Sequence, residues 1–290
     1  MLGLAQKHGY AVGHFNTNNL EETQAIINAA VALSSPVIVA TSHKALAFAG
    51  DSLPTIIKHL AQAKIPVALH LDHSPTVKLA IECIDNGYTS VMIDTSQLKY
   101  RQNVAATKRV VDYAHRRKVS VEAEIGVLKG VEDDVVSTKE FLTIPAQARR
   151  FVNDTRCDSL AIAIGTSHGA FKFKGTPRLD LADLKEIREE VQVPLVLHGA
   201  SSVYPALVHD INRFGGNIKH AEGVPEAMLK KAIGLGICKI NTDTDLRLAF
   251  ILGCRRYLIE HPEGFDLRNA LTEARAEMQH MVARKIRLFG

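Results

Sequence analysis

Short apolar runs alternate with segments of helical periodicity along the whole chain, and this alternation limits the possible folds more than any other feature. Each run is followed at short spacing by an amphipathic stretch, and a further one over 267–288 closes the chain. Strict alternation over eight units predicts an α/β fold in which parallel strands close into a (β/α)8 (TIM) barrel with an extra C-terminal helix. The runs are 11–16, 36–42, 66–72, 89–94, 119–126, 159–165, 193–199 and 238–243.

An open, doubly wound sheet would also alternate strands with helices. That fold predicts a glycine-rich turn after the first strand, and GHFNTNN at 13–19 is not one. With 290 residues and 46% hydrophobic residues, the chain is long enough to bury one sizeable core. We therefore expect residues 1–290 to form a single barrel domain.

Polar side chains gather where the predicted strands end. In parallel barrels the C-terminal ends of the strands form the active-site face. The starts of the strands carry no comparable set, so the pattern favours an active site at one end. The residues at or just past those ends are Asn16, Ser42, Asp72, His73, Asp94, Glu124, His168, His198, Asn241 and Asp243.

Three of these strand ends deliver a histidine: His73, His168 and His198. Each one alone could be a hydrogen-bonded core residue, but three imidazoles with an open fourth position are what a catalytic zinc site needs. Asp72 and His73 cannot both point inward from a regular strand, so His73 must lie where the strand is already turning. His70 shares the parity of Asp72, and we expect it deeper, as a core residue or a support for the ligands.

The carboxylates at these ends suggest acid–base chemistry. Asp72 beside a metal ligand is a candidate general base, because a neighbouring cation would keep it ionised. Asp94 and Glu124 could bind a second metal position or orient the histidines. Glu132 falls in a polar loop predicted over 127–144. From a loop it could reach a substrate carbon, and a solvated acid is the alternative.

Two regions have the composition of phosphate sites, which need backbone amides, small residues and a cation. One combines GAS at 199–201 with SHGAFK at 167–172. The other is TDTDLR at 242–247, with a threonine at a helix start and Arg247 in the first turn. Helix capping is the competing explanation for these threonines. Two such regions beside a metal suggest a substrate with a phosphate at each end.

Charge and composition exclude other classes of partner. The net charge is +4 and the charges are mixed, with no basic run interleaved with aromatic residues, so we expect no nucleic acid partner. No apolar stretch approaches the roughly 20 residues that span a bilayer. The start, MLGLAQKHGY, has no long apolar core, so we expect no signal peptide, and the four cysteines show no CxxC spacing. We expect a cytoplasmic protein with buried, reduced thiols and no membrane contact.

Five segments, HLDHS, VEAEIG, GTSHGAFKFKG, LVLHGASS and INTDTDLR, together resemble the class II, metal-dependent fructose-bisphosphate aldolases. The similarity covers essentially the whole chain. It implies a barrel that assembles as a homodimer or homotetramer and works in glycolysis and gluconeogenesis. The implied reaction is reversible cleavage of a phosphorylated sugar, fructose 1,6-bisphosphate, to dihydroxyacetone phosphate and glyceraldehyde 3-phosphate.

The resemblance also assigns roles. It implies that His73, His168 and His198 bind zinc, which polarises the C2 carbonyl. Asp72 would act on the C4 hydroxyl, and Glu132 would transfer the proton at carbon. Asp94 and Glu124 match acids of an alternative metal position, and a monovalent cation (sodium or potassium) lies near the first phosphate. The implied substrate-binding residues are Asn16, Ser42, Gly169, Lys172, Gly199, Ser201, Asn241, Asp243, Thr244 and Arg247, the last for the distal phosphate.

Some positions depart from the family's pattern, and other functions compete. Tagatose-bisphosphate aldolase is the nearest alternative, although TDTDLR and the GNIKHAEG insertion resemble the fructose branch. A metal-dependent hydrolase would leave the two phosphate regions unexplained. A non-catalytic binding protein would not be expected to keep the complete set of acids and histidines. The departures are His14, His43, Lys44, Ser74, Pro75 and Gln97.

Overall fold

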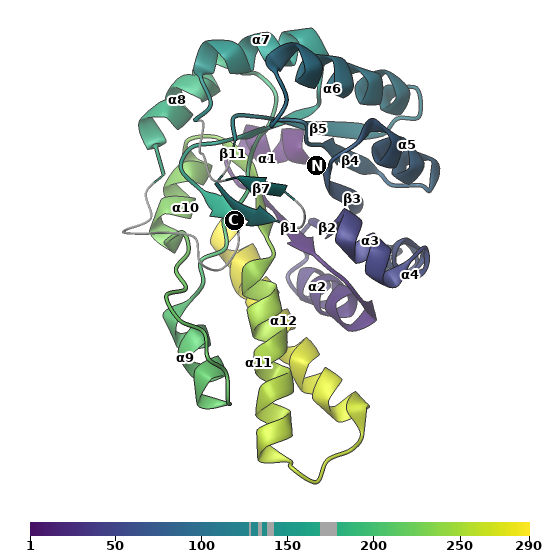
Figure 1. The fold of residues 1–290 in the computed structure, drawn as a ribbon, viewed down its shortest axis with the longest axis vertical. Coiled ribbons are helices and arrows are strands. Elements are labelled where there is room, and N and C mark those ends of the chain that lie inside the picture. The colour runs from purple at the N-terminus through teal and green to yellow at the C-terminus, as the bar shows by residue number, and fades with distance from the viewer. Residues whose placement is uncertain (128, 133–134, 138–141, 169–178) are drawn as a thin grey trace.

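The computed structural model describes residues 1–127, 129–132, 135–137, 142–168 and 179–290. Eight parallel strands close into a barrel, as the alternation predicts (Figure 1). The strands are β1 (Val12–Asn16), β2 (Val37–Thr41), β3 (Val67–Ser74), β4 (Ser90–Ile93), β5 (Ser120–Ile125), β8 (Ser159–Ile162), β10 (Leu195–Leu197) and β11 (Ile237–Thr242). They follow one another around the barrel in the order β1-β11-β10-β8-β5-β4-β3-β2.

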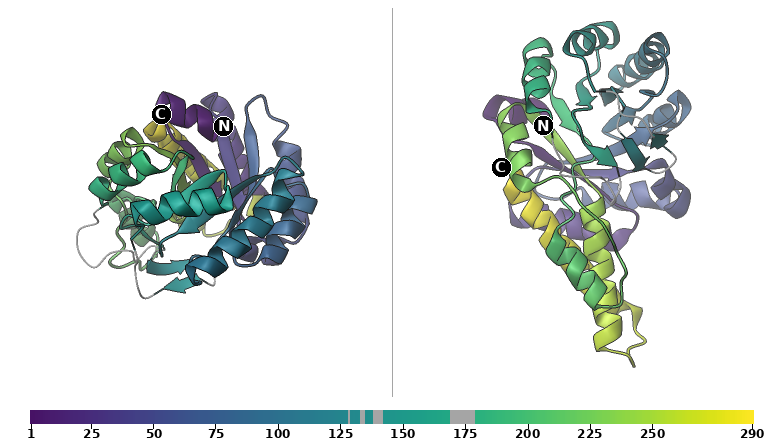
Figure 2. Two further views of the ribbon diagram at one scale, coloured as in Figure 1. Left: turned by 90° about the horizontal axis from the view of Figure 1, so that it is seen from above. Right: turned by 60° about the vertical axis from the view of Figure 1, so that its left-hand side comes forward.

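Helices surround the barrel (Figure 2). They are α1 (Leu2–His8), α2 (Leu20–Ala32), α3 (His43–Ala49), α4 (Ser52–Leu60), α5 (Val77–Asp85), α6 (Tyr100–His115), α7 (Pro145–Thr155), α8 (Leu181–Glu190), α9 (Pro205–Arg213), α10 (Glu226–Gly234), α11 (Thr244–Glu260) and α12 (Leu267–Phe289). The sequence pattern missed α3, because seven residues carry too little periodicity to be recognised.

The predicted polar loop at 127–144 is wrong in part. Strands β6 (Lys129–Glu132) and β7 (Val135–Ser137) pair antiparallel there. They form a small sheet with β9 (Ser167–His168), which follows directly after the run predicted at 159–165. Strands of two to four residues are too short for an alternating pattern to reveal them.

The outward faces of the barrel strands pack against the helices in one large core, which includes Val39, Val91 and Val121, each fully buried. The inward face is mixed. Met92, Ala161 and Val196 form a small apolar cluster there. By the strand registers, polar side chains occupy the same level of the interior, so part of the barrel centre is built from charged groups.

The ends of the barrel differ in character. Helix α1 covers the N-terminal end, where its Ala5 packs with Val12, Ile38 and Cys238. The polar residues gather at the opposite end. The free cysteines are buried or, at Cys254, half-buried, which confirms the expectation of buried thiols.

Helices α11 and α12 run side by side and project beyond the barrel, as Figure 1 and the right-hand view of Figure 2 show. On its way back α12 packs against α2 and β1. Its buried Lys285 contacts Asp245 in the first turn of α11, with Nζ 2.7 Å from Oδ2. Within the described ranges, no helix has the length and apolar character needed to cross a membrane.

Candidate functional site

Strand β3 turns at His73, as the parity argument predicts. His73 has a φ of 43°, in the left-handed region that non-glycine residues seldom adopt. The register with β4 shifts between Leu71 and Ser74, which marks a β-bulge. The bulge allows Asp72 and His73 to face the barrel interior together, and both are buried. Such strain is typical of functional sites.

His73 and His198 face each other across the barrel. His73 Nε2 lies 2.8 Å from His198 Nδ1. The other nitrogen of each ring contacts a carboxylate: His73 Nδ1 is 2.9 Å from Asp94 Oδ2, and His198 Nε2 is 2.8 Å from Glu122 Oε1. Because carboxylates accept these two N–H groups, the facing nitrogens both present lone pairs.

This donor set fits a divalent metal ion. Two lone pairs that face each other repel unless a cation or a proton lies between them, and carboxylate–histidine pairs are the usual support of metal-bound imidazoles. Ligand atoms of Asp72, His73 and His198 lie within 4.8 Å of one another, and so do those of His73, Asp94 and Glu124. Asp94 and Glu124 therefore adjoin the same imidazole, Glu124 with Oε2 3.9 Å from Nδ1.

The electrostatics favour neutral imidazole and ionised carboxylate. Burial, together with the neighbouring His73, lowers the pKa of His198 to about 4. Burial acts to raise the pKa of Asp94, but hydrogen bonds from His73 and Ser96 lower it to about 2. At neutral pH His198 is therefore uncharged, the state in which it can bind a metal.

Asp72 is held by two asparagines. Asn16 Nδ2 donates to Asp72 Oδ2 at 2.8 Å, and Asn241 Nδ2 donates to Oδ1 at 3.2 Å. Burial opposes ionisation, yet the imidazoles of His14, His73 and His198 keep the pKa of Asp72 well below its usual value. The candidate base is thus an oriented carboxylate beside the histidine pair.

Asn241 links the base to the metal ligands. Its Nδ2 also lies 2.9 Å from His198 Nδ1. Its Oδ1 is buried and has no hydrogen-bond partner among the residues that the structure describes. A buried acceptor of this kind is costly unless something donates to it, so it is a point where a hydroxyl group of a substrate could bind.

Three contributors to this interior network were not predicted: Glu122, Lys239 and His14. Lys239 Nζ lies 2.6 Å from Glu122 Oε2 and 3.4 Å from His70 Nε2. Strand parity could have found the first two, because Glu122 shares the parity of Glu124, and Lys239 that of Asn241. His70 is buried among these groups, which confirms the deep position predicted for it.

The third predicted zinc ligand, His168, lies in β9 beside the site. Gly199 has a φ of +60°, and a Cβ atom there would lie 2.6 Å from the Ser167 carbonyl oxygen. The backbones that carry His168 and His198 therefore touch. The structure describes no side chain for His168, and Gly169 and Lys172 lie outside the described residues.

Glu132 belongs to β6, which pairs with β9 through Gly130 and His168. Its strand therefore runs beside the strand of a predicted ligand, although only its backbone is described.

The second phosphate-like region adjoins the first. Asp245, in the first turn of α11, accepts hydrogen bonds from the backbone N–H groups of Ser202 and Val203. Those residues directly follow Ser201, which is buried. Through Asp245, the start of α11 and the loop after β10 form one unit.

The remaining predicted residues have contacts of their own. Ser42 caps α3, where its Oγ accepts from the Ala45 N–H. Asp243 Oδ1 accepts from Arg247 Nε at 2.8 Å, and Thr244 opens α11. These positions lie at the same end of the barrel as Asp72.

Comparison with known proteins shows similarity over the entire chain. The family model described as "Fructose-bisphosphate aldolase class-II" matches residues 1–290. A fructose-bisphosphate aldolase of Thermus caldophilus is 48% identical over 293 residues, covering 100% of this chain and 96% of the relative. One from Giardia intestinalis is 46% identical, covering 100% and 91%. The crystal structure of the YdjI aldolase of Escherichia coli K12 superimposes with a TM-score of 0.81 at 31% identity, covering 100% and 95%.

Proposed function

The chain belongs to the class II fructose-bisphosphate aldolase family, and from this premise we propose that it cleaves fructose 1,6-bisphosphate reversibly. The products would be dihydroxyacetone phosphate and glyceraldehyde 3-phosphate, within glycolysis and gluconeogenesis. The observation that carries the proposal is the facing pair of His73 and His198, each backed by a carboxylate, directly beside the oriented carboxylate of Asp72. A metal-dependent aldol cleavage needs these two elements, a metal site and a base, within reach of one substrate.

The identity of the metal follows from the ligand atoms that the site offers. We propose that His73, His168 and His198 would hold zinc, with Asp94 and Glu124 orienting His73 or offering a second position. Bound zinc supplies Lewis acidity toward a carbonyl oxygen, so no lysine Schiff base is required. A sodium or potassium ion would complete the site near the first phosphate.

The protein's own groups move the protons. Asp72 accepts the proton of the C4 hydroxyl as the C3–C4 bond breaks and the aldehyde forms at C4. The bonding pair stays with C3, which receives a proton from Glu132. Asn16 and Asn241 keep the Asp72 carboxylate in place through its two oxygens.

Phosphate binding would use both ends of the substrate. We propose that Gly199, Ser201, Asp243 and Thr244, with Ser42, Gly169 and Lys172, surround the dihydroxyacetone-phosphate end. Arg247, which is half-exposed and paired with Asp243, would receive the distal phosphate. An arginine suits this role because its guanidinium can contact phosphate oxygens in pairs.

Parallel assays decide between the fructose and tagatose bisphosphates. The names of the relatives favour the fructose sugar. Each sugar would be tested with and without a chelator, with zinc counted in the same sample. Chelator-sensitive cleavage that prefers fructose bisphosphate supports the proposal. A preference for tagatose bisphosphate would keep the metal chemistry and change the substrate, and zinc-bound protein that cleaves neither sugar would contradict the aldolase function.

We also propose that the protein works as a cytoplasmic homodimer or homotetramer. The α11–α12 pair exposes apolar side chains near its tip, where Phe265 is 98% exposed and Leu267 is 68% exposed. Contact with a second copy would cover them. Light scattering of wild type and Phe265→Asp tests this, because a shift of the variant to monomer supports the surface and an unchanged mass contradicts it.

A further inference from the structure

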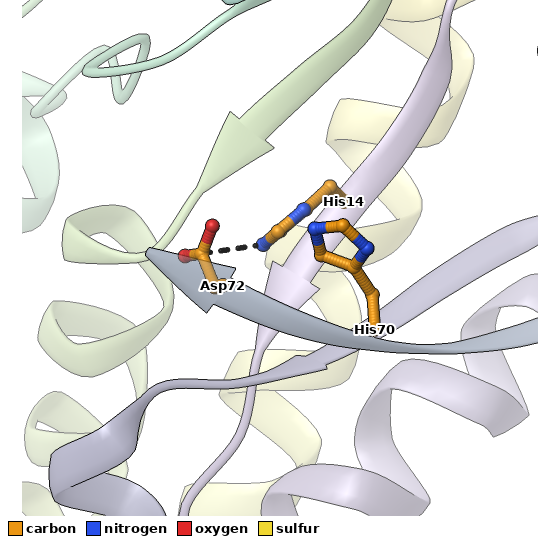
Figure 3. A group of neighbouring side chains, drawn as sticks. All are labelled: His14, His70 and Asp72. Carbon is orange, nitrogen blue, oxygen red and sulfur yellow. Dashed lines mark ion pairs between the residues drawn. The ribbon is translucent and has the colours of Figure 1, made fainter. Parts of the chain in front are cut away.

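His14 lies at the base of the site and takes part in none of the steps above. It is fully buried in β1, where its ring meets His70 edge-on with centroids 5.3 Å apart (Figure 3). A polar ring that is this deeply buried must be satisfied by its neighbours, or it costs stability. Those neighbours therefore indicate what the ring does.

The contacts of His14 lead to Asp72. His14 Nε2 lies 3.1 Å from Asn16 Oδ1 and 3.5 Å from Asp72 Oδ2. Asn16 in turn donates from Nδ2 to the same Asp72 oxygen at 2.8 Å. The three side chains thus form a small triangle, with the imidazole below the amide and the carboxylate.

The tautomer of His14 follows from this triangle. Both groups facing Nε2 are acceptors, so Nε2 carries the proton and donates it. Among the described residues Nδ1 has no hydrogen-bond partner, consistent with a neutral ring. The donated bond also fixes the amide of Asn16, because Oδ1 must face His14 for Nδ2 to face Asp72.

A metal ion held by His14, His70 and Asp72 is the competing explanation, since their ligand atoms lie within 4.8 Å of one another. The surroundings argue against it. Lys239 Nζ stands 3.4 Å from His70 Nε2, and His70 Nδ1 already contacts Ser90 Oγ at 2.7 Å. A second cation would have to sit against an ammonium group in a buried space.

We propose that His14 is a positioning residue, which holds the Asn16 amide and the Asp72 carboxylate in the orientation that accepts the C4-hydroxyl proton. The inference rests on the proposed aldol cleavage, and it adds a group that acts through Asn16 and Asp72 without touching the substrate. A misplaced catalytic group costs rate even when binding is unchanged. Loss of His14 should therefore lower kcat rather than raise KM.

Two variants distinguish the hydrogen bond that His14 donates from the packing of its side chain. His14→Leu keeps an apolar side chain of similar size and removes the donor. His14→Gln retains an N–H near the position of Nε2. We expect His14→Leu to lower kcat for cleavage about tenfold, the effect of one lost hydrogen bond to a charged network, with KM changed less than about twofold. His14→Gln should recover most of that loss, and zinc content should stay that of wild type in both.

A partial reaction excludes general damage to the site. Exchange of solvent deuterium into dihydroxyacetone phosphate, without aldehyde present, needs the proton step at carbon but not the step at the C4 hydroxyl. His14→Leu should leave this exchange at the wild-type rate. Equal losses in exchange and cleavage would mean general damage and overturn the inference, as would an unchanged kcat or a failure of His14→Gln to rescue.

Crystal structures test the positioning role of His14 without relying on the proposed reaction. If the wild-type protein cleaves no sugar, the proposed function fails on its own. The positioning role is then judged by comparing wild type with His14→Leu. A flipped Asn16 amide, or an Asp72 carboxylate displaced by more than about 0.5 Å, supports it, and superimposable side chains overturn it.

Discussion

Glu122 holds His198 from behind: its Oε1 lies 2.8 Å from His198 Nε2, and neither side chain is more than 3% exposed. The other carboxylate oxygen, Oε2, contacts Lys239 Nζ at 2.6 Å. Lys239 therefore keeps Glu122 ionised, and burial notwithstanding, the pKa of Glu122 is well below its usual value. An ionised Glu122 fixes the His198 proton on Nε2, so Nδ1 presents an electron pair that a metal could take in place of the Asn241 amide 2.9 Å away.

Glu122→Gln should weaken zinc binding. The amide keeps the shape of the side chain but removes the charge, and loss of such a carboxylate partner typically costs about 10- to 100-fold in metal affinity. Zinc affinity would be measured by competition with a chelator. Glu273→Gln, which changes a carboxylate paired with Arg256 on the outer surface, is the control and should bind zinc as wild type does. Equal affinity in Glu122→Gln would show that Glu122 does not support the metal site.

Asp72→Ala should retain zinc and lose most turnover. General acid–base groups contribute roughly 100- to 10,000-fold, so kcat for fructose 1,6-bisphosphate should fall within that range. Steady-state kinetics and zinc counts on the same sample make the test. Asp85→Ala, which removes an exposed partner of Tyr113, should behave as wild type. A loss of less than a few-fold in Asp72→Ala would reject Asp72 as the base.

The metal-free protein should lose stability in mild acid. Burial and the neighbouring His73 lower the pKa of His198 from 6.5 to about 4, so between these values the unfolded chain binds a proton that the folded chain does not. The free energy of unfolding is therefore retained above pH 6.5 and falls as the pH decreases toward 4. One such proton gives a slope of about 1.4 kcal/mol per pH unit.

Urea unfolding in the presence of a chelator, at several values of pH in this window, measures the slope. His198→Asn should reduce this slope by the contribution of about one proton. His209→Asn, at an exposed position, should not change it. His14 and His70 have lowered pKa values for the same reason, first of all burial, so part of the slope should remain in His198→Asn.

Much of the barrel could be predicted because each strand and helix carries its own pattern. The eight strands, their helices and the turn at His73 follow from periodicity and parity. Strands β6, β7 and β9 could not be predicted, since each has at most four residues, and β9 forms only by pairing with β6 more than thirty residues away, as in Gly130 with His168.

The residues of the candidate site likewise divide into those that the sequence predicts and those that it does not. Residues at strand ends can be recognised in a sequence because polar residues there follow a run of apolar ones. Glu122 and Lys239 lie inside strands, and their burial is explained by contacts between strands, above all the ion pair that joins β5 to β11. His14 reaches Asp72 from β1, which lies on the other side of β2 from β3, and the spacing along the chain does not reveal this contact.

Arg247→Ala should raise KM for the bisphosphate with a smaller change in kcat. The Arg247 side chain is 53% exposed and bound to Asp243, and turning to a ligand phosphate would break this surface ion pair at little cost. Initial rates over a range of substrate concentrations give both constants. The matched control is Arg268→Ala, an exposed arginine paired with Asp266 at the start of α12. An unchanged KM in Arg247→Ala would remove this residue from the distal phosphate site.

Lys285→Met should destabilise the protein strongly, because it breaks a buried ion pair. Lys285 and Asp245 are both 0% exposed, with Nζ 2.7 Å from Oδ2, and Lys285 also donates to Ser202 Oγ. Removing one partner leaves an uncompensated buried charge, which typically costs about 3–5 kcal/mol. Chemical denaturation of the zinc-bound protein measures the loss.

Lys285→Met should also weaken substrate binding. Asp245 orders the backbone of Ser202 and Val203, so an unpaired Asp245 that shifts toward water would loosen the loop of Gly199 and Ser201 and raise KM. Lys78→Ala, which breaks an exposed pair with Glu82, is the control and should change stability by less than about 1 kcal/mol. If Lys285→Met lowers the free energy of unfolding no more than this control does, the Lys285–Asp245 pair does not anchor α12 to the loop. If stability falls while KM stays constant, the anchor holds the fold without shaping the phosphate site.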